Sequence, residues 1–115
     1  MNTVSVRRVY DEPLDSDGAR VLVDRLWPRG LSKQKAHLDA WCKEVAPTAE
    51  LRQWYRHEPD RFDEFARRYL AELETPEQAA GLLQLHAFVA TGPLTLLTAT
   101  KHPEISEAAV LAEML

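Results

Sequence analysis

The sequence predicts an α/β fold with a small, largely parallel sheet of three to four strands, flanked by about five helices in a Rossmann-like layered architecture. Two short apolar runs, at residues 21–23 and 94–97, are bounded by turn residues, which is typical of strands buried on both faces. Helical spacing of apolar residues dominates the chain between them, from residue 48 onward. A helix between two strands allows the crossover that parallel pairing needs.

Two strands are predicted in the first quarter of the chain. Residues 4–10 carry β-branched and aromatic side chains in partial alternation, and residues 20–26 centre on a Val-Leu-Val run. The second strand ends at Pro28 and Gly30, because proline lacks the N–H that a sheet ladder needs and glycine accepts a positive φ. The polar residues around this stop therefore stand at a strand end.

A short helix and a third strand are predicted next. Ser32 is a suitable N-cap for the helix, since its hydroxyl can accept a backbone N–H of the first turn. Residues 38–45 fit strand alternation, but Trp41 and Val45 also stand at helical i, i+4 spacing. We predict a strand that Pro47 ends, with a helix as the alternative.

The second half of the chain is mainly helical. Thr48 begins one helix, Pro59 begins another, and residues 75–78 (Thr-Pro-Glu-Gln) form a capping signature for a third that ends before Gly92. The predicted helices span about residues 48–57, 60–73, 75–90 and 105 or 106 to 115, and a buried strand spans residues 94–98.

Composition indicates one globular domain that covers residues 1–115. A chain of 115 residues with 45% hydrophobic and 28% charged residues suits a single core. No apolar run approaches the roughly 20 residues of a membrane helix, and the N-terminus lacks the basic-then-apolar order of a signal peptide. We therefore expect a cytoplasmic protein with no membrane partner, and the oligomeric state stays open.

The charge distribution favours a small anionic ligand over a nucleic acid. A net charge of -4 argues against general nucleic-acid binding, because phosphate neutralisation needs a basic face. Basic residues nevertheless crowd the first third of the chain: Arg7, Arg8, Arg20, Arg25, Arg29, Lys33 and Lys35. Cys42 is the only cysteine and the four histidines lack metal-ligand spacing, so we expect no internal disulfide, no metal and no cofactor.

Polar side chains follow the predicted central strand directly. Its carboxyl end carries Asp24, Arg25, Trp27 and Arg29. Ligands bind at such strand ends in parallel α/β sheets, where arginines offer bidentate donors to phosphate or carboxylate and an indole offers a stacking surface. The alternative is structural: Asp24 pairs with Arg25 or Arg29, and the Trp27 ring fills the core.

A second polar cluster follows the strand at residues 94–98. Thr98 and Lys101 stand near the start of the last helix, where free backbone N–H groups favour an anion. An ordinary strand-to-helix turn explains the same residues, since no glycine-rich phosphate loop accompanies Lys101. His57, at the end of a helix, is either a capping residue or a general acid/base.

Residues 23–33 (Val-Asp-Arg-Leu-Trp-Pro-Arg-Gly-Leu-Ser-Lys) resemble the YeaO-like family of bacterial proteins, domain of unknown function family 488. The likeness covers nearly the whole chain and implies a small cytoplasmic α/β protein with no established activity. Family members tend to carry an acidic residue after the lysine that follows the last strand, and a His-Asn pair a few positions on. Here these are His102 and Ile105-Ser106. If these positions serve the family's site, this chain has altered or lost part of it.

Two hypotheses for function follow. In the first, the protein is an enzyme or a degenerate enzyme acting on a small anionic ligand. Arg25, Arg29 and Lys101 then hold the anion, Trp27 and Thr98 line the site, and Asp24 or His57 moves protons. In the second, it is a non-catalytic binding or regulatory module for a protein partner, with nucleic acid less favoured, and the Asp-Arg-Leu-Trp-Pro-Arg-Gly block is structural.

Overall fold

The computed structural model describes residues 2–115, and its centre is a four-stranded sheet in which all neighbouring strands are parallel. The strands are β1 (Val4–Arg8), β2 (Ala19–Leu22), β3 (Ala40–Trp41) and β4 (Leu94–Thr98), in the order β1-β4-β2-β3. The helices are α1 (Lys33–Ala36), α2 (Ala49–Tyr55), α3 (Phe62–Glu72), α4 (Pro76–Thr91) and α5 (Glu107–Met114). The predicted α/β class is confirmed.

The two apolar runs of the sequence form the two central strands. β4 lies between β1 and β2, with Leu96 beside Val6 on one side and Val21 on the other. Every residue of β4 is buried, whereas β1 at the sheet edge is only partly buried. The apolar character of each strand therefore follows its position, because only a central strand is covered on both faces.

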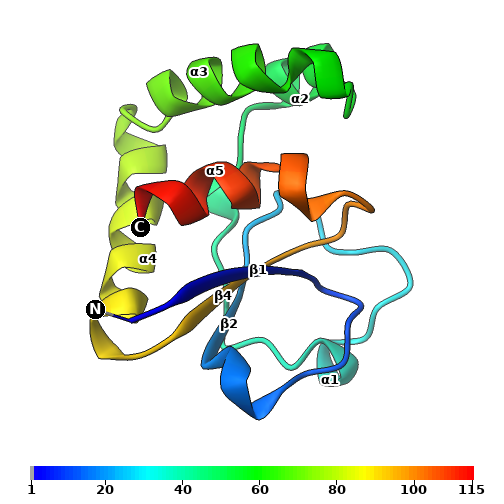
Figure 1. Ribbon diagram of the computed structural model, residues 1–115, viewed down its shortest axis with the longest axis vertical. Coiled ribbons are helices and arrows are strands. Elements are labelled where there is room, and N and C mark those ends of the chain that lie inside the picture. The colour runs from blue at the N-terminus through cyan, green and yellow to red at the C-terminus, as the bar shows by residue number, and fades with distance from the viewer. Residues whose placement is uncertain (1) are drawn as a thin grey trace.

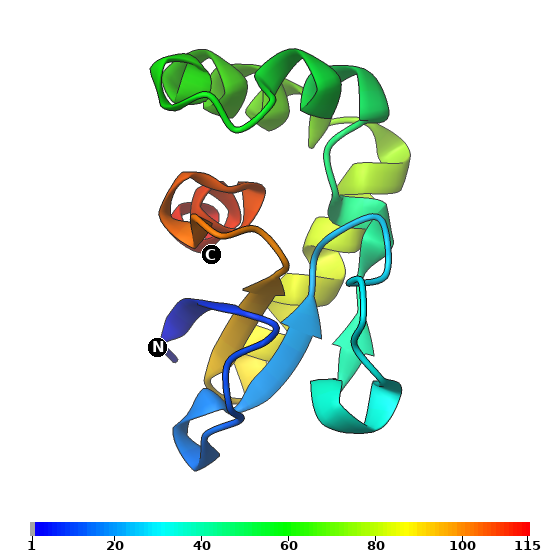
Figure 2. The ribbon, with the colours of Figure 1, turned by 90° about the vertical axis from the view of Figure 1, so that its right-hand side faces the viewer.

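The two faces of the sheet are covered differently. Figure 1 shows α2, α3 and α5 on one side of the sheet and α1 on the other, and Figure 2 shows the same layers from the side. The larger core joins the sheet to the helices and contains Val21, Leu96, Phe65, Tyr69, Leu85 and Leu111. The smaller core lies on the opposite face and contains Val9, Leu22 and Leu97, with Trp27, Leu31 and Leu38 packed against it. The loop after β2 thus forms part of the hydrophobic cover.

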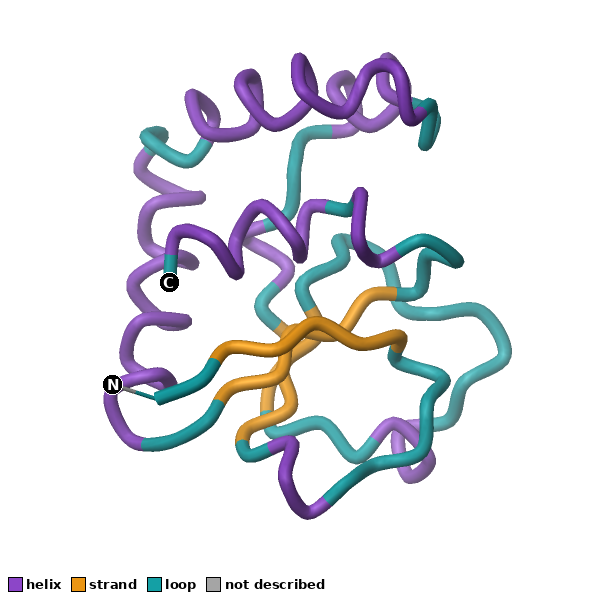
Figure 3. Tube along the Cα trace, viewed as in Figure 1, coloured by secondary structure: helices purple, strands orange, loops and turns teal. Residues whose placement is uncertain are grey.

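β2 is shorter than the predicted strand at residues 20–26. Its ladder ends at Leu22, although the Val23 N–H still donates to the Leu97 carbonyl (3.1 Å). One residue later the Asp24 carboxylate, rather than a backbone carbonyl, accepts the N–H of Ala99. This side-chain contact replaces the ladder and frees the chain to leave the sheet. Figure 3 shows the long loops that extend from the carboxyl ends of the strands.

The predicted strand at residues 38–45 is only two residues long. After Trp41 the Cys42 N–H still donates to Leu22 O (2.8 Å), and then Lys43–Val45 form a 3-10 turn. This turn packs closely on α4 at Gly81, where an added Cβ would lie 2.9 Å from the Val45 nitrogen. The chain therefore leaves the sheet edge because its contact with α4 replaces further pairing.

The predicted caps at Ser32 and Thr48 are confirmed, Ser106 adds a cap that was not predicted, and the cap at Thr75 differs. The hydroxyls of Ser32, Thr48 and Ser106 accept backbone N–H groups of α1, α2 and α5. The predicted side-chain cap at Thr75 is wrong, because its hydroxyl instead donates to Gln78 Oε1 (2.8 Å) while the Gln78 amide donates to Ala46 O. None of the helices in the described part of the chain is long and apolar enough to cross a membrane.

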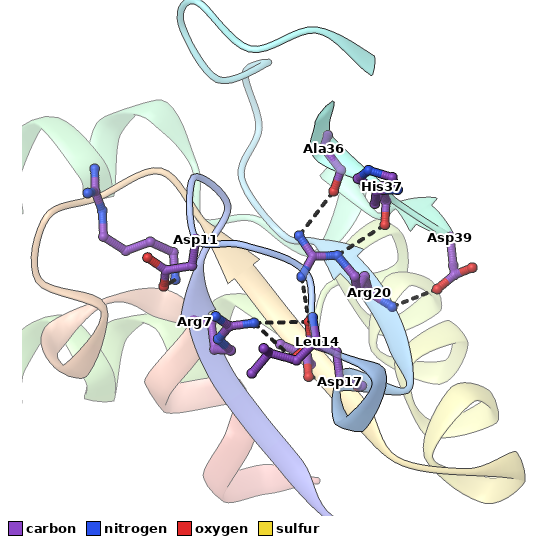
Figure 4. A network of polar contacts seen from close by, with 10 residues as sticks. Arg7, Asp11, Leu14, Asp17, Arg20, Ala36, His37 and Asp39 are labelled. Carbon is purple, nitrogen blue, oxygen red and sulfur yellow. Dashed lines mark hydrogen bonds and ion pairs between the residues drawn. The ribbon is translucent and has the colours of Figure 1, made fainter. Parts of the chain in front are cut away.

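A buried ion-pair network closes the amino end of β2 (Figure 4). The Asp17 carboxylate accepts from Arg7 Nη1 (3.0 Å), Arg20 Nη1 (2.6 Å) and the Leu14 N–H (2.9 Å). Arg20 also donates to the carbonyls of His37 and Ala36. Burial raises the pKa of Asp17, but the bonds from Leu14, Arg20 and Arg7 outweigh burial and hold that pKa below its ordinary value.

Candidate functional site

A cavity of about 520 Å³ opens at the carboxyl ends of β2 and β4. Its walls come from the loop after β2, the residues after β4, the end of α2 and the start of α5. Among its lining residues are six that the sequence marked as candidates: Asp24, Arg25, Trp27, Arg29, His57 and Thr98. Parallel strands end at the same edge of a sheet, so residues far apart in sequence meet there. We refer to this space as the β2–β4 cavity.

Asp24 ties the two strand ends together. Its Oδ1 accepts from the Thr98 hydroxyl (2.8 Å) and its Oδ2 accepts from the Ala99 N–H (2.8 Å). Its backbone carbonyl accepts from the Trp41 indole N–H (2.7 Å). Both carboxylate oxygens therefore have a donor, and the side chain has one defined orientation in the cavity wall.

Arg25 has a buried donor without an acceptor. Its Nη2 donates to Ala46 O (3.2 Å), but its Nε is buried and has no hydrogen-bond partner in residues 2–115. No carboxylate in that part of the chain forms an ion pair with Arg25. The structural alternative, in which Asp24 pairs with Arg25 or Arg29, is therefore not what the structure has.

Arg29 and Arg52 are the other guanidinium groups of the β2–β4 cavity. Both residues are exposed, and within residues 2–115 neither forms an ion pair. The backbone carbonyl of Arg29 accepts from the Tyr10 hydroxyl (2.8 Å), which holds the loop after β2 against the end of β1. The cavity thus carries three arginines whose charges are not matched by ion pairs.

Trp27 combines the two roles that the sequence left open. Its indole N–H donates to Leu31 O (2.7 Å), and its ring packs edge-on against Trp41 with 5.4 Å between centroids. The ring also belongs to the smaller core and lines the β2–β4 cavity. Trp27 therefore closes the loop after β2 and presents an aromatic surface to the cavity.

His57 and Lys101 occupy different positions relative to the cavity. His57 follows α2 with φ of 56°, directly after Arg56 with φ of 49°, and its Nδ1 lies 3.4 Å from the Thr100 hydroxyl. This turn brings the exposed imidazole to the rim of the cavity. Lys101 is exposed and is not among the lining residues, so the structure does not bring it together with Arg25 and Arg29.

Glu107 is the main cavity residue that sequence reasoning missed. It begins α5, and its carboxyl group contacts that of Asp24. Burial raises the pKa of Glu107 well above its ordinary value, and the hydrogen bond and charge of Asp24 raise it further, whereas Arg52 opposes the shift. The raised pKa favours the protonated form of Glu107, in which its O–H is the donor of the hydrogen bond to Asp24. In the sequence, Glu107 is only an acidic residue in the first turn of a helix. Such residues are common and do not indicate a cavity.

Tyr55 and Phe65 add aromatic surface to the same cavity. Their rings stack with 4.2 Å between centroids, and both line the space. The Tyr55 hydroxyl donates to Ile105 O (2.6 Å), and burial raises the pKa of Tyr55 to about 12. Tyr55 is therefore a neutral donor that fixes the turn before α5 against α2.

Cys42 and the histidines lie apart from any metal-like arrangement. Cys42 is buried next to α4, with its Sγ 3.5 Å from Gly81 O, and burial raises the pKa of its thiol to about 11. Within residues 2–115, no three His, Cys, Asp or Glu side chains come together in a way that could hold a metal ion. Cys42 is thus a protonated core residue rather than a thiolate.

These features define a small α/β protein with a polar cavity at the carboxyl edge of a parallel sheet. Residues 3–115 match a family model described as "Inactive DUF488-N3 subclade", and the chain belongs to this DUF488 family. It is 49% identical over 112 residues to the uncharacterised protein Rv3073c of Mycobacterium tuberculosis, which covers 97% of this chain and 92% of that protein. It is 43% identical over 112 residues to the uncharacterised protein YeaO of Escherichia coli, covering 97% and 96%. No solved structure matches.

The comparisons confirm the YeaO-like resemblance that residues 23–33 carried. They add no activity, because the relatives named above are themselves described as uncharacterised.

Proposed function

We propose that this protein binds a small anionic ligand, bearing a phosphate or carboxylate group, in the β2–β4 cavity. The observation that carries the proposal is that Arg25, Arg29 and Arg52 line one cavity and form no ion pair within residues 2–115. The buried Nε of Arg25 also has no acceptor within these residues. An unsatisfied buried donor costs roughly 1–3 kcal/mol, and more when it is charged.

The charges around the cavity support an anion. Arg29 and Arg52 line it beside Arg25. The raised pKa of Glu107 favours its neutral form, which lowers the negative charge of the cavity wall. The three guanidinium groups also outnumber the two carboxyl groups among the lining residues, and arginine forks match the geometry of phosphate and carboxylate oxygens.

The proposal is for binding without turnover. The matched subclade is described as inactive, which favours a ligand-binding role over catalysis. Ser106, at one of the positions where the family resemblance implies a polar pair, uses its hydroxyl to bond Pro103 O and to cap α5. The proton-transfer roles expected of Asp24 and His57 remain a hypothesis. A cytoplasmic location is part of the same proposal, because small anionic metabolites are available there.

Thermal unfolding of the full chain in increasing inorganic phosphate tests the proposal. We expect the midpoint to rise with phosphate concentration, because a ligand that binds only the folded state stabilises it. Arg25→Gln abolishes the rise. The matched control is Arg56→Gln, which removes an exposed arginine whose side chain donates to Gln53 O and which is not among the lining residues.

Each variant is compared with its own phosphate-free midpoint, so a change in basal stability does not affect the result. Arg52→Gln, at an exposed position, gives a second variant if Arg25→Gln folds poorly. The proposal is wrong if the wild-type midpoint does not respond to phosphate, or if Arg25→Gln and Arg52→Gln respond as strongly as Arg56→Gln.

A further inference from the structure

The β2–β4 cavity is much larger than an isolated oxyanion. Its volume is about 520 Å³, whereas the share of one liquid water molecule is about 30 Å³ and a phosphate ion fills only a few such volumes. Cavities of roughly 300–1,000 Å³ are typical of sites for small organic ligands. If the arginines hold the anionic group, most of the cavity is left for an organic part.

The wall formed by Asp24 and Glu107 has free hydrogen-bond acceptors. Each oxygen of Asp24 receives one protein donor, from Thr98 or Ala99, and a carboxylate offers about four lone-pair positions in all. The hydrogen bond with Glu107 occupies one more, and the Glu107 carboxyl group, which also bonds to its own backbone N–H, keeps a further acceptor position. The pair therefore accepts hydrogen bonds from O–H or N–H groups of a ligand.

The same cavity disfavours a cationic group on that ligand. Arg25, Arg29 and Arg52 line it, and a ligand ammonium would be repelled by three like charges. Neutral hydroxyl groups satisfy the acceptors of the Asp24–Glu107 pair without this repulsion. Trp27, Tyr55 and Phe65 add ring surface, against which the carbon skeleton of a ligand can pack.

We infer that the ligand is a polyhydroxylated organic anion, such as a sugar phosphate or sugar acid, whose hydroxyl groups bind the Asp24–Glu107 pair while the three arginines hold its anionic group. This inference rests on the proposed anion site and specifies its ligand. The shared chemistry is one anionic group joined to several hydroxyls on a small carbon skeleton.

Isothermal titration of the full chain with matched probes tests the inference. Ribose 5-phosphate and ethyl phosphate carry the same anionic group, but only the first carries the sugar hydroxyls. We expect ribose 5-phosphate to bind at least about tenfold more tightly, which corresponds to about 1.4 kcal/mol. Gluconate and hexanoate repeat the comparison with a carboxylate as the anionic group. Together the two pairs show whether the site prefers a phosphate or a carboxylate. Ribose alone is expected to bind weakly, since it lacks the anion.

Variants of Glu107 connect the preference to the carboxyl pair. Glu107→Ala is expected to reduce the preference for ribose 5-phosphate over ethyl phosphate to less than about threefold, while ethyl phosphate still binds. Glu107→Gln keeps a neutral donor and an acceptor of similar shape, so it retains most of the preference and serves as the folded control if Glu107→Ala unfolds.

The outcomes separate the two proposals. If the wild type binds ethyl phosphate and hexanoate as tightly as their hydroxylated partners, the polyhydroxylated ligand is ruled out and the anion site stands. If Glu107→Ala keeps the full preference, the carboxyl pair is not the hydroxyl-binding element. If no anionic probe binds at all, the anion site itself fails and this inference fails with it.

Discussion

The two ends of β2 carry similar charged residues, which form ion pairs with one another at the amino end but not at the carboxyl end. At the amino end, Asp17 lies between Arg7 and Arg20 in a closed network, and Asp17 and Arg20 are each only 4% exposed. At the carboxyl end, Asp24 bonds to Thr98, Ala99 and Glu107 instead, and the buried Nε of Arg25 has no acceptor within residues 2–115. An arginine beside an aspartate in sequence therefore does not by itself reveal whether the charges serve stability or a site.

The difference arises from what each arginine can reach. The Arg20 guanidinium donates to the Asp17 carboxylate and to the carbonyls of His37 and Ala36, so its charge and its donors are matched inside the fold. Within residues 2–115, the Arg25 guanidinium donates only to Ala46 O. We interpret the Arg7–Asp17–Arg20 network at the amino end as structural, and we refer to it as the clamp. We interpret the carboxyl end as a pre-organised site.

The largest effect is expected from breaking the clamp. Arg20→Met leaves the Asp17 charge buried with a weaker set of donors, and removing one partner of a buried ion pair costs about 3–5 kcal/mol. Urea unfolding monitored by circular dichroism measures this loss. The matched control is Glu64→Ala, which removes the exposed pairs with Arg67 and Arg68 and is expected to change stability far less. Equal effects of the two substitutions would contradict the interpretation of the clamp.

The pH dependence of stability is expected to have opposite signs at the two ends. Glu107 has a raised pKa in the folded state, so its stabilising contribution is full below about 4.5 and is lost as pH rises through the folded pKa. Asp17 has a lowered pKa, so its contribution is present above about 3.8 and is lost as pH falls through the folded pKa. Each group changes the unfolding free energy by at most about 1.4 kcal/mol per pH unit.

Unfolding free energies measured by urea titration between about pH 3 and pH 8 test these signs, because this range begins below the ordinary Asp and Glu pKa values and extends well above them. Glu107→Gln is expected to flatten the decline on the alkaline side, and Asp17→Asn to flatten the decline on the acidic side. A Glu107→Gln profile that still falls with rising pH as the wild type does would show that the carboxyl pair does not cause the decline.

A smaller effect is expected from Arg25→Met in the absence of ligand. The substitution removes the unsatisfied Nε, and Ala46 O keeps a donor because Gln78 Nε2 also bonds to it (3.1 Å). We expect the unfolding free energy to change by less than about 1 kcal/mol, in either direction. Thermal unfolding without added anions measures it. A loss comparable to that of Arg20→Met would place Arg25 in a structural clamp as well.

The smallest effect is expected from Lys101→Ala. Because Lys101 is exposed and is not among the residues that line the β2–β4 cavity, its removal is expected to change phosphate affinity less than about twofold, mainly through long-range charge. Titration at two ionic strengths separates that charge effect from a direct contact. A loss of affinity equal to that of Arg25→Gln would restore Lys101 to the site.

Much of the fold follows from local patterns. The burial of β4 and the start of α2 were visible as an apolar run and as the N-cap Thr48, because these features depend on residues close together in the chain. The exceptions have tertiary causes. Thr75 does not cap α4 because Gln78, which bonds to Ala46, provides a partner for its hydroxyl. The strand at Trp41 is short because the following turn packs on Gly81.

The candidate site was likewise predictable from the sequence only in part. Asp24, Arg25, Trp27 and Arg29 form one continuous block after a strand, so the sequence alone determined that charged and aromatic residues stand at that strand end. Tertiary structure decided that Arg25 has no ion pair within residues 2–115, that Lys101 lies outside the cavity lining and that Glu107 contacts Asp24. The physical reason is that ionic pairing and protonation depend on distance and burial, which are set by α5 folding back across the sheet rather than by neighbours in the chain.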